Sequence, residues 1–398
     1  MQVADRIRQI PPSATLALNT KANQLKAQGV DIVNFGVGEP DFDTPENIRE
    51  AAIRAIREGF TRYTPVGGIP ELKEAIARKF QEDYGLSYKP GEIVVSCGGK
   101  HALYNLFQVL FNPGDEVAIP APFWVSYVPM AMLAEATPVV IPTREENGFK
   151  LTPRELRERL SPRTKALVLN SPSNPTGCVY SREELAALGE VVLEHGLYVI
   201  SDDIYDKIRF DGAAFVNLAM LAPELKARTF VLNGLSKTYA MTGWRIGYLA
   251  GPEPAIAAAT NLQSQSTSNP TSIAQKAGVE ALNGPQDAVT AMVAEFAWRR
   301  DDIYERVLKI PGVSAPKPAG AFYIFPNFSH YYGKLSPEPG QSNSQALAAY
   351  LLEEARVAAV PGGEFGEDRC LRFSFATSRE RIATGLSRIR EALEKLGR

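Results

Sequence analysis

The sequence predicts an α/β protein built on a mostly parallel sheet, followed by a second, smaller α/β unit. Short runs that are apolar throughout alternate with amphipathic stretches along the middle of the chain, a pattern typical of parallel strands covered on both faces. The chain has 398 residues, more than one core usually holds, so two domains are expected. We predict an N-terminal arm with part of the small domain over 1–45, a large domain over 46–290 and a small domain over 291–398.

The expected strands of the large domain are apolar throughout, and helical stretches separate most of them. The strands cover 92–96, 117–120, 139–141, 166–170, 197–201 and 229–232. Helical periodicity covers 101–111 and 182–195. Because ligands of such sheets bind beyond the carboxyl ends of the strands, polar residues that follow these strands are the first candidates for a site.

The smaller unit begins where the pattern changes, after about residue 285. Its expected elements are a helix over 286–310, a strand over 321–325, a helix over 345–356, a strand over 370–375 and a closing helix over 379–396. Mixed strands and helices there indicate a second α/β unit. The Pro11-Pro12 pair and the loop 36–43 predict an irregular N-terminal arm, and 336–343 predicts a polar loop.

Composition excludes several classes of function. The net charge is -2 and no basic block occurs, so nothing favours a nucleic-acid or membrane-surface partner. No apolar run approaches the length of a membrane span, and the N-terminus lacks the apolar core of a signal peptide, which predicts a cytoplasmic protein. Three distant cysteines indicate reduced thiols. Three histidines without metal-ligand spacing predict no metal site.

The segment from Asn233 to Gly247 places one lysine, Lys237, just after an apolar strand. A desolvated lysine loses proton affinity and becomes a nucleophilic amine that can form an imine with an aldehyde. Ser236 beside it and Arg245 further on would suit a phosphate. An aldehyde with a phosphate describes pyridoxal 5′-phosphate (PLP). Taken alone, a surface lysine after a strand is the commoner explanation.

Two further motifs follow predicted strands. Gly98-Gly99-Lys100 precedes a helix, where backbone N–H groups and the helix N-terminus favour a phosphate. Neither GxGxxG nor GxxxxGK[ST] occurs, which disfavours a dinucleotide or nucleoside triphosphate. Asp202 ends a buried strand, where a carboxylate needs a partner such as a protonated pyridine nitrogen, and Tyr205 would bond the ring's phenolic oxygen. A helix N-cap is the alternative explanation of Asp202.

Three more residues suit a cofactor or an amino acid. Asn174, in the run from Asn170 to Gly177, offers an amide, although this composition is also that of a plain turn. Trp124 offers a flat face for ring stacking or for core packing. Arg372, on a predicted strand, matches a carboxylate bidentately, and a structural salt bridge would explain it equally.

Together these motifs resemble the class I/II aminotransferases of PLP fold type I, most of all the bacterial aspartate aminotransferase subgroup Ib. The resemblance covers essentially the whole chain. The segments that support it are Pro12–Thr15, Gly38–Pro45, Tyr63–Pro65, Gly68–Leu72, Gly98–Lys100, Pro122–Tyr127, Asn174–Gly177, Ser201–Tyr205, Asn233–Gly247 and Arg372–Ser378. It implies a seven-stranded, mostly parallel sheet between helices, PLP as cofactor, and a homodimer with shared active sites.

The resemblance also implies roles, with Lys237, Asp202 and Tyr205 as the catalytic residues. Lys237 would form the Schiff base, and Asp202 would pair with the pyridine nitrogen. The implied contacts of the cofactor are Tyr205 and Asn174 to the ring oxygen, Trp124 to the ring face, Gly99, Lys100, Ser236 and Arg245 to the phosphate, and Tyr63 to the phosphate of the neighbouring subunit. The implied substrate contacts are Arg372, Asn174 and Gly38 to the α-carboxylate, Lys100 to the distal carboxylate, Trp124, and Ser13 and Thr15 in an arm that closes over the site.

The implied reaction is ping-pong amino transfer between L-aspartate and 2-oxoglutarate, giving oxaloacetate and L-glutamate. Prephenate, aromatic, alanine or kynurenine transamination, or β-elimination, are alternatives on the same scaffold. A catalytically silent PLP-fold regulator is disfavoured because no DNA-binding extension is present. The chain departs from the family pattern at Gly234, where many relatives have serine, and at Pro11, where relatives that accept prephenate tend to have lysine.

Overall fold

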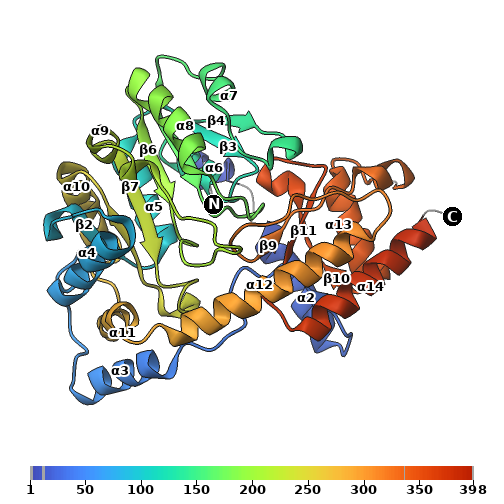
Figure 1. The fold of residues 1–398 in the computed structure, drawn as a ribbon, viewed down its shortest axis with the longest axis horizontal. Coiled ribbons are helices and arrows are strands. Elements are labelled where there is room, and N and C mark those ends of the chain that lie inside the picture. Colours follow the sequence, from blue (N-terminus) through green and yellow to red (C-terminus); the bar gives the residue numbers. More distant parts are fainter. Residues whose placement is uncertain (1–2, 11–13, 336, 397–398) are drawn as a thin grey trace.

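The large parallel sheet is present in the computed structural model, which describes residues 3–10, 14–335 and 337–396. Within these residues seven strands form one sheet in the order β2-β8-β7-β6-β5-β3-β4 (Figure 1). The strands are β2 (Ile93–Ser96), β3 (Glu116–Ala121), β4 (Thr137–Pro142), β5 (Thr164–Asn170), β6 (Tyr198–Asp202), β7 (Thr229–Gly234) and β8 (Gly247–Ala250). Only β8 runs antiparallel to its neighbours. The predicted fold class is confirmed.

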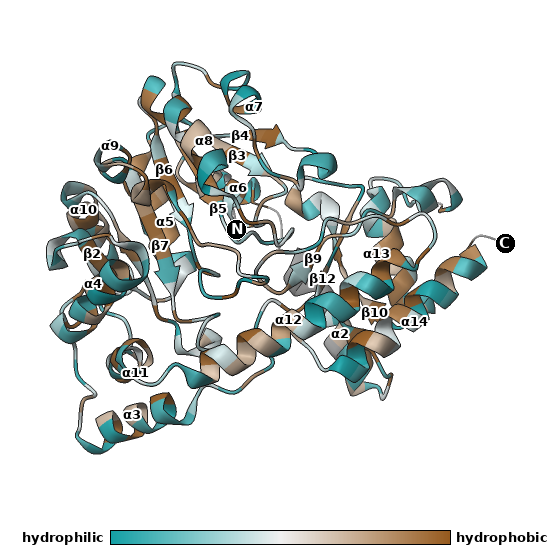
Figure 2. Ribbon diagram, viewed as in Figure 1, coloured by the Kyte–Doolittle hydropathy of each residue, from teal (hydrophilic) through white to brown (hydrophobic). Residues whose placement is uncertain are grey.

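Helices cover both faces of this sheet because successive strand residues point to opposite sides. Phe230 and Leu232 of β7 pack in the core under α5 (Gly99–Leu110), α6 (Tyr127–Leu133) and α10 (Glu253–Ser264), whereas Val231 packs in the core under α4 (Pro70–Tyr84) and α11 (Ser272–Asn283). Figure 2 shows hydrophobic residues along the central strands and polar residues on the outer helix faces. The continuous apolar runs of the sequence have this double burial as their cause.

The second unit joins both ends of the chain. Strand β1 (Val33–Asn34) pairs in parallel with β10 (Val357–Ala358), and β11 (Val360–Pro361), β12 (Leu371–Ser374) and β9 (Tyr323–Ile324) form an antiparallel sheet. Its core packs under α12 (Asp287–Leu308), α13 (Asn343–Glu354) and α14 (Arg379–Leu396). The predicted domain boundaries stay predictions. Residue 290 lies inside α12, a continuous helix that extends from the large sheet toward α14 in Figure 1.

The other helices connect these layers. They are α1 (Asp5–Arg8), α2 (Ala14–Ala27), α3 (Glu46–Arg57), α7 (Pro153–Arg157), α8 (Arg182–Glu194) and α9 (Pro223–Lys226), with short 3-10 turns at Pro90–Glu92, Glu145–Asn147, Leu218–Met220, Thr242–Trp244, Ser329–Lys334 and Gly362–Phe365. None of the helices among the described residues is both long and apolar enough to cross a membrane.

Two predictions of local structure were incomplete. The N-terminal arm is not irregular throughout, because the Ala-, Leu- and Lys-containing segment Ala14–Ala27 forms α2. The predicted strand 321–325 is only two residues long, because Ala321 has a left-handed φ of 55° that cannot continue a strand. Pro11 and Ser13 lie outside the described residues.

Candidate active site

A cavity of about 810 Å³ lies at the carboxyl ends of the large sheet's parallel strands. The ends of β5, β6 and β7 are in lateral register there, with Asn170 beside Asp202 and Asp202 beside Leu232. Most of the predicted site residues line it, namely Gly38, Gly99, Lys100, Trp124, Asn174, Asp202, Tyr205, Ser236, Lys237, Arg245 and Arg372. Residues from both units of the fold therefore meet at one cavity.

At one end of the cavity, glycines allow the backbone at the start of α5 to pack closely against β8 and against the guanidinium of Arg245. A Cβ added to Gly247 of β8 would lie 2.2 Å from the backbone nitrogen of Gly99, so α5 can begin where it does only because residue 247 is glycine. Gly98 has a φ of +89°, and a Cβ there would lie 2.3 Å from a terminal nitrogen of Arg245. The N-terminus of α5 and the Arg245 side chain consequently lie together, an arrangement that attracts anions.

The same packing explains the departure at Gly234. Gly234 lies opposite Gly247 in the β7–β8 pair. A Cβ added at Gly234 would lie 3.1 Å from the Cα of Gly247, from the carbonyl of Ile246 and from the side chain of Ile204. Two of these neighbours are backbone, so a serine would require β8 to shift by a few tenths of an ångström. Close strand packing is thus the physical reason for glycine at a position where the sequence comparison expected a hydroxyl.

Asp202 is a buried carboxylate with unused acceptor capacity. Its Oδ2 accepts a hydrogen bond from the Tyr127 hydroxyl at 2.6 Å, and its Oδ1 accepts one from the Ile204 backbone at 3.3 Å. Burial raises the pKa of Asp202 to about 6, an effect that these two bonds and the charge of Lys237 partly oppose. Because these contacts do not offset the cost of burying its negative charge, a cationic partner in the cavity would stabilise the ionised carboxylate.

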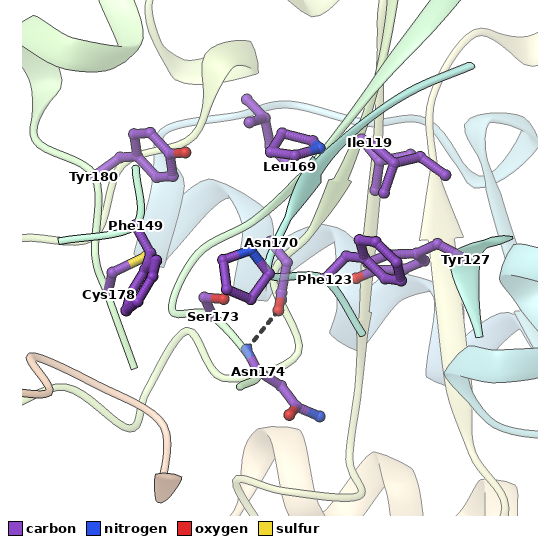
Figure 3. Close-up of a pocket in the computed structure, with 13 residues that line it drawn as sticks. Ile119, Phe123, Tyr127, Phe149, Leu169, Asn170, Ser173, Asn174, Cys178 and Tyr180 are labelled. Atoms are coloured by element: carbon purple, nitrogen blue, oxygen red, sulfur yellow. Dashed lines mark hydrogen bonds between the residues drawn. The ribbon is translucent and has the colours of Figure 1, made fainter. Parts of the chain in front are cut away.

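Asn174 is held by its backbone, which leaves its side chain for the cavity. The Asn174 N–H donates to Oδ1 of Asn170 at 2.8 Å, and in Figure 3 the Asn174 amide points away from the small cavity behind this loop. That small cavity, about 20 Å³ and lined by groups that include Ser173 and Tyr180, has room for one water molecule. The Asn174 Oδ1 accepts from Arg372 at 3.1 Å.

Arg372 brings a buried guanidinium from β12 to the cavity. It donates to Asn174 and, at 2.8 Å, to the carbonyl of Gly36, and it stacks 4.6 Å from the centre of the Tyr323 ring. Its Nε has no hydrogen-bond partner among the described residues. That Nε is itself buried, but each terminal nitrogen carries a second N–H besides the one in these bonds, and a planar guanidinium can offer such groups to a carboxylate. Tyr205 lies nearby, with its hydroxyl 3.0 Å from that of Tyr323.

Lys237 follows β7 and reaches the loop that enters the site from the N-terminal side. Its Nζ donates to the carbonyl of Gly38 at 2.5 Å. Burial lowers the pKa of Lys237 to about 8; nearby Arg372 and Arg245 add to the effect, and Glu39 and Asp202 oppose it. The amine is consequently much closer to its nucleophilic, neutral form at physiological pH than an exposed lysine.

This lowered pKa gives a direct prediction. In protein freed of cofactor, the rate at which a limiting amount of an amine-acylating reagent modifies Lys237 should rise with pH, reach half its maximum at about pH 8 and then level off. The reason is that only the neutral amine reacts. Peptide mass spectrometry would follow Lys237 and the surface lysine Lys165 in the same sample. A Lys237 midpoint near the ordinary value of 10.5 would contradict the environment described.

Lys100 supplies a second cation at the start of α5. Its Nζ lies 5.0 Å from the centre of the Trp124 ring, close enough for a cation–π contact. Burial of the ammonium group and the charge of Arg245 both lower the pKa of Lys100. Trp124 in turn packs edge-on against Tyr127 at 5.3 Å, which holds the indole at the cavity wall.

The structure does not bring every predicted residue to this cavity. Tyr63 is 91% exposed and does not line it. Thr15 belongs to α2, and Ser13 lies outside the described residues. Sequence reasoning gave no role to Tyr127 and Tyr323, which contact site residues. Both occur in predicted or quoted segments, but a tyrosine there could not be distinguished from core packing.

Comparisons with known proteins agree with this site. The family model described as "Aminotransferase class I and II" matches residues 30–389. The chain is 51% identical over 394 residues to the aspartate aminotransferase of Geobacillus stearothermophilus, covering 99% of each chain. It is 48% identical over 396 residues to the aspartate/prephenate aminotransferase of Nitrosomonas europaea, covering 99% of this chain and 100% of the other.

Solved structures show the same likeness in three dimensions. The aspartate aminotransferase of Rhizobium meliloti superposes with a TM-score of 0.94 at 44% identity, covering 99% of both chains. That of Thermus thermophilus, solved with maleate, gives a TM-score of 0.91 at 43% identity, covering 98% of this chain and 100% of the other. These proteins share the whole fold with the chain.

Proposed function

The chain belongs to the class I and II aminotransferases, and on this premise we propose that it is a PLP-dependent aspartate aminotransferase, which exchanges an amino group between L-aspartate and 2-oxoglutarate. The observation that supports this most is the single cavity that Lys237, Asp202 and Arg372 share with a second cation, Lys100. The relatives named as aspartate aminotransferases agree with a dicarboxylate substrate.

The residues of the cavity fit PLP. The glycine-packed N-terminus of α5, with Ser236 and Arg245, forms a cradle for a phosphate. Asp202, whose buried charge is only partly offset by its hydrogen bonds, suits a protonated pyridine nitrogen. Tyr205 and Asn174 supply polar groups for the ring oxygen. When bound, PLP supplies an aldehyde for covalent attachment and an electron-withdrawing ring.

The protein's own groups then perform the proton chemistry and the orientation. Lys237, with its lowered pKa, would attach the cofactor and, once freed, would take the proton from the substrate Cα as a general base. Asp202 would keep the ring nitrogen protonated, and its bond from Tyr127 fixes the carboxylate in place. Trp124, at the cavity wall, would offer its indole face to the ring.

Substrate recognition divides between two cations. Arg372, whose guanidinium lines the cavity beside Asn174, suits the α-carboxylate that every amino acid has. The Gly38 backbone lines the same cavity, two residues after the Gly36 carbonyl that accepts from Arg372. Lys100 suits the second carboxylate of aspartate, 2-oxoglutarate or maleate, which the Thermus relative was solved with. Ser13 and Thr15 belong to the arm proposed to close over the substrate.

Tyr63 supports a homodimer with shared sites. A tyrosine side chain that is 91% exposed in one subunit is available to a second copy of the chain. We assign it to the phosphate of the neighbouring subunit's cofactor, which makes each site depend on both subunits.

A donor–acceptor matrix tests this function. Amino acids are paired with keto acids, prephenate included, and product formation is measured. We expect aspartate with 2-oxoglutarate to give the highest kcat/KM. Prephenate is the second candidate acceptor, because two relatives at 48% identity are named aspartate/prephenate aminotransferases. Absence of aspartate turnover, with activity on another pair, would replace the proposed substrate.

The variant Lys100→Ala sharpens the same matrix. Without the second cation, kcat/KM for aspartate should fall about 30-fold or more, since truncating one partner of a desolvated charge pair has that effect. Alanine lacks the second carboxylate and should be much less affected, so it serves as the control substrate. Equal losses for both amino acids would remove Lys100 from substrate recognition.

A further inference from the structure

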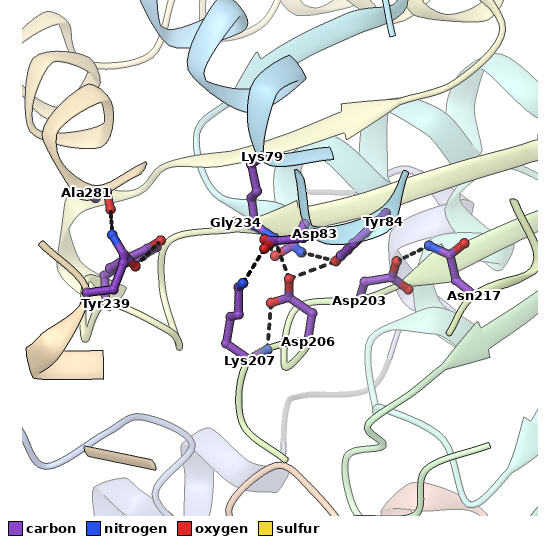
Figure 4. A network of polar contacts seen from close by, with 12 residues as sticks. Lys79, Asp83, Tyr84, Asp203, Asp206, Lys207, Asn217, Gly234, Tyr239 and Ala281 are labelled. Atoms are coloured by element: carbon purple, nitrogen blue, oxygen red, sulfur yellow. Dashed lines mark hydrogen bonds and ion pairs between the residues drawn. The ribbon is translucent and has the colours of Figure 1, made fainter. Parts of the chain in front are cut away.

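The face of the β6 turn that points away from the cavity holds a buried polar network, in which Lys79 and Tyr84 meet Asp206 (Figure 4). Asn233 bonds Tyr84 in turn, and we call these four residues the rear network. No step of the proposed reaction uses these side chains. Resting on the proposed function, we propose that the rear network consists of positioning residues, which hold the end of β6 against the end of β7 so that Asp202, Tyr205 and Lys237 point into one cavity.

The end of β6 and the turn after it present residues to both of their sides. Asp202 and Tyr205 line the cavity, whereas Asp203 and Asp206 do not and are each 1% exposed. A change in the position of Asp206 therefore acts directly on Tyr205, its neighbour in the chain. Asp206 is also bonded through its backbone, because its N–H donates to the Asp203 carbonyl at 2.9 Å and its own carbonyl accepts from Arg209 at 2.7 Å.

Lys79 holds Asp206 from helix α4. Its side chain is 8% exposed, and its Nζ contacts Oδ2 of Asp206 and, at 3.0 Å, Oδ2 of Asp83. Burial by itself lowers the pKa of Lys79, but the charges of Asp206 and Asp83 outweigh it, and the net shift is upward. The pair is consequently an ion pair, and removing Lys79 would leave Asp206 as a buried carboxylate without its cation, whereas Lys79 without Asp206 would keep Asp83.

Tyr84, also on α4, links this pair to β7. Its hydroxyl donates to Oδ2 of Asp206 at 2.8 Å and accepts from the amide of Asn233 at 3.0 Å. Asn233 is fully buried in β7, and its Oδ1 accepts from the N–H of Gly234 at 2.7 Å. One hydroxyl thus joins the β6 turn to the strand that ends shortly before Lys237.

The carboxyl groups at the end of β6 give an electrostatic reason for the cation Lys79 beside them. Asp202, Asp203 and Asp206 are three buried carboxyl groups within five residues. Burial raises the pKa of Asp203 to about 8, and nearby Asp206 and Asp202 add to this, while bonds from Ser201 and Asn217 oppose it. Lys79 offsets the charge of Asp206, which otherwise opposes ionisation of the neighbouring Asp203.

The test compares Tyr84→Phe and Asp206→Asn with the wild type in two measurements that need no amino acid. The first is the Kd of PLP for cofactor-free protein, from fluorescence quenching. The second is the pH midpoint of the visible absorbance of bound PLP. We expect about threefold weaker binding for Tyr84→Phe, about tenfold weaker binding for Asp206→Asn, and a shifted midpoint in both. Tyr84→Phe removes only a hydroxyl and keeps the aromatic packing of the core.

Glu116→Gln is the matched control, because Glu116 is a buried carboxylate at the amino end of β3, bonded to Ser161, Arg163 and Thr164. It should lower Tm without changing either measurement. If Asp206→Asn does not fold, Lys79→Met with Asp206→Asn removes both charges together. Variants that lower Tm but keep the wild-type Kd and midpoint would overturn the positioning role. Lack of amino transfer by wild-type protein would refute the proposed function alone.

Discussion

Replacing Lys237 with alanine is expected to lower kcat by about four orders of magnitude or more, the upper range for loss of a positioned general base. The side chain has two proposed duties, since it attaches the cofactor and moves the substrate proton. Among the described residues that line the cavity the one other lysine is Lys100, which lies in the first turn of α5, at the proposed phosphate cradle. Substitution of Lys237 therefore removes both duties at once.

The measurement is single-turnover and steady-state amino transfer by purified protein. Borohydride reduction of the wild type, followed by peptide mapping, should leave the cofactor on Lys237 and on no other lysine. Lys165→Ala is the control, because Lys165 lies at the amino end of β5 in a surface pair with Asp115. Wild-type-like turnover by Lys237→Ala would remove the assignment.

The second large effect is expected for Arg372→Lys. The substitution keeps a positive charge but loses the planar fork, and it leaves Asn174 and the Gly36 carbonyl without their donors. Loss of a buried, hydrogen-bonded charge partner corresponds to about 2–5 kcal/mol, or roughly 30- to 5000-fold in kcat/KM. Because all amino acids have an α-carboxylate, aspartate and alanine should lose activity by similar factors.

Steady-state kinetics with aspartate and with alanine distinguish the effect of Arg372→Lys from that of Lys100→Ala. The Lys100 substitution should lower kcat/KM for dicarboxylates alone. Arg388→Lys is the matched control, since Arg388 pairs with Asp31 at the surface and should tolerate the change. A loss for Arg372→Lys that is confined to aspartate, or that is smaller than threefold, would contradict its assignment to the α-carboxylate.

The large sheet was predictable because its strands are buried on both faces. Runs such as 166–169 and 230–232 are apolar at every position, and the structure places them in β5 and β7. The rule that ligands bind beyond the carboxyl ends of parallel strands then pointed to Asp202 and Lys237. Strand β8 is short, and β1, β10 and β11 have two residues each, too few for any periodicity to indicate them.

Other parts of the site could not be derived from local pattern. Nothing near Gly234 explains a glycine there; the reason is Gly247, which becomes its neighbour only when β8 pairs with β7. The roles of Tyr127 and Tyr323 likewise depend on where their hydroxyls point, toward Asp202 and Tyr205. The rear network was also hidden, because Lys79 is unremarkable until α4 packs behind Asp206.

The sequence by itself determined the fold class, the strand ends and the kinds of chemical group at them, because burial pattern and residue type are local properties of the chain. Only the tertiary structure decided which of these groups share a cavity and in what electrostatic state. Lys237 becomes a reactive amine, and Arg372 an unsaturated donor, through burial against segments distant in sequence. Desolvation and charge proximity depend on distances in space, and no spacing along the chain contains them.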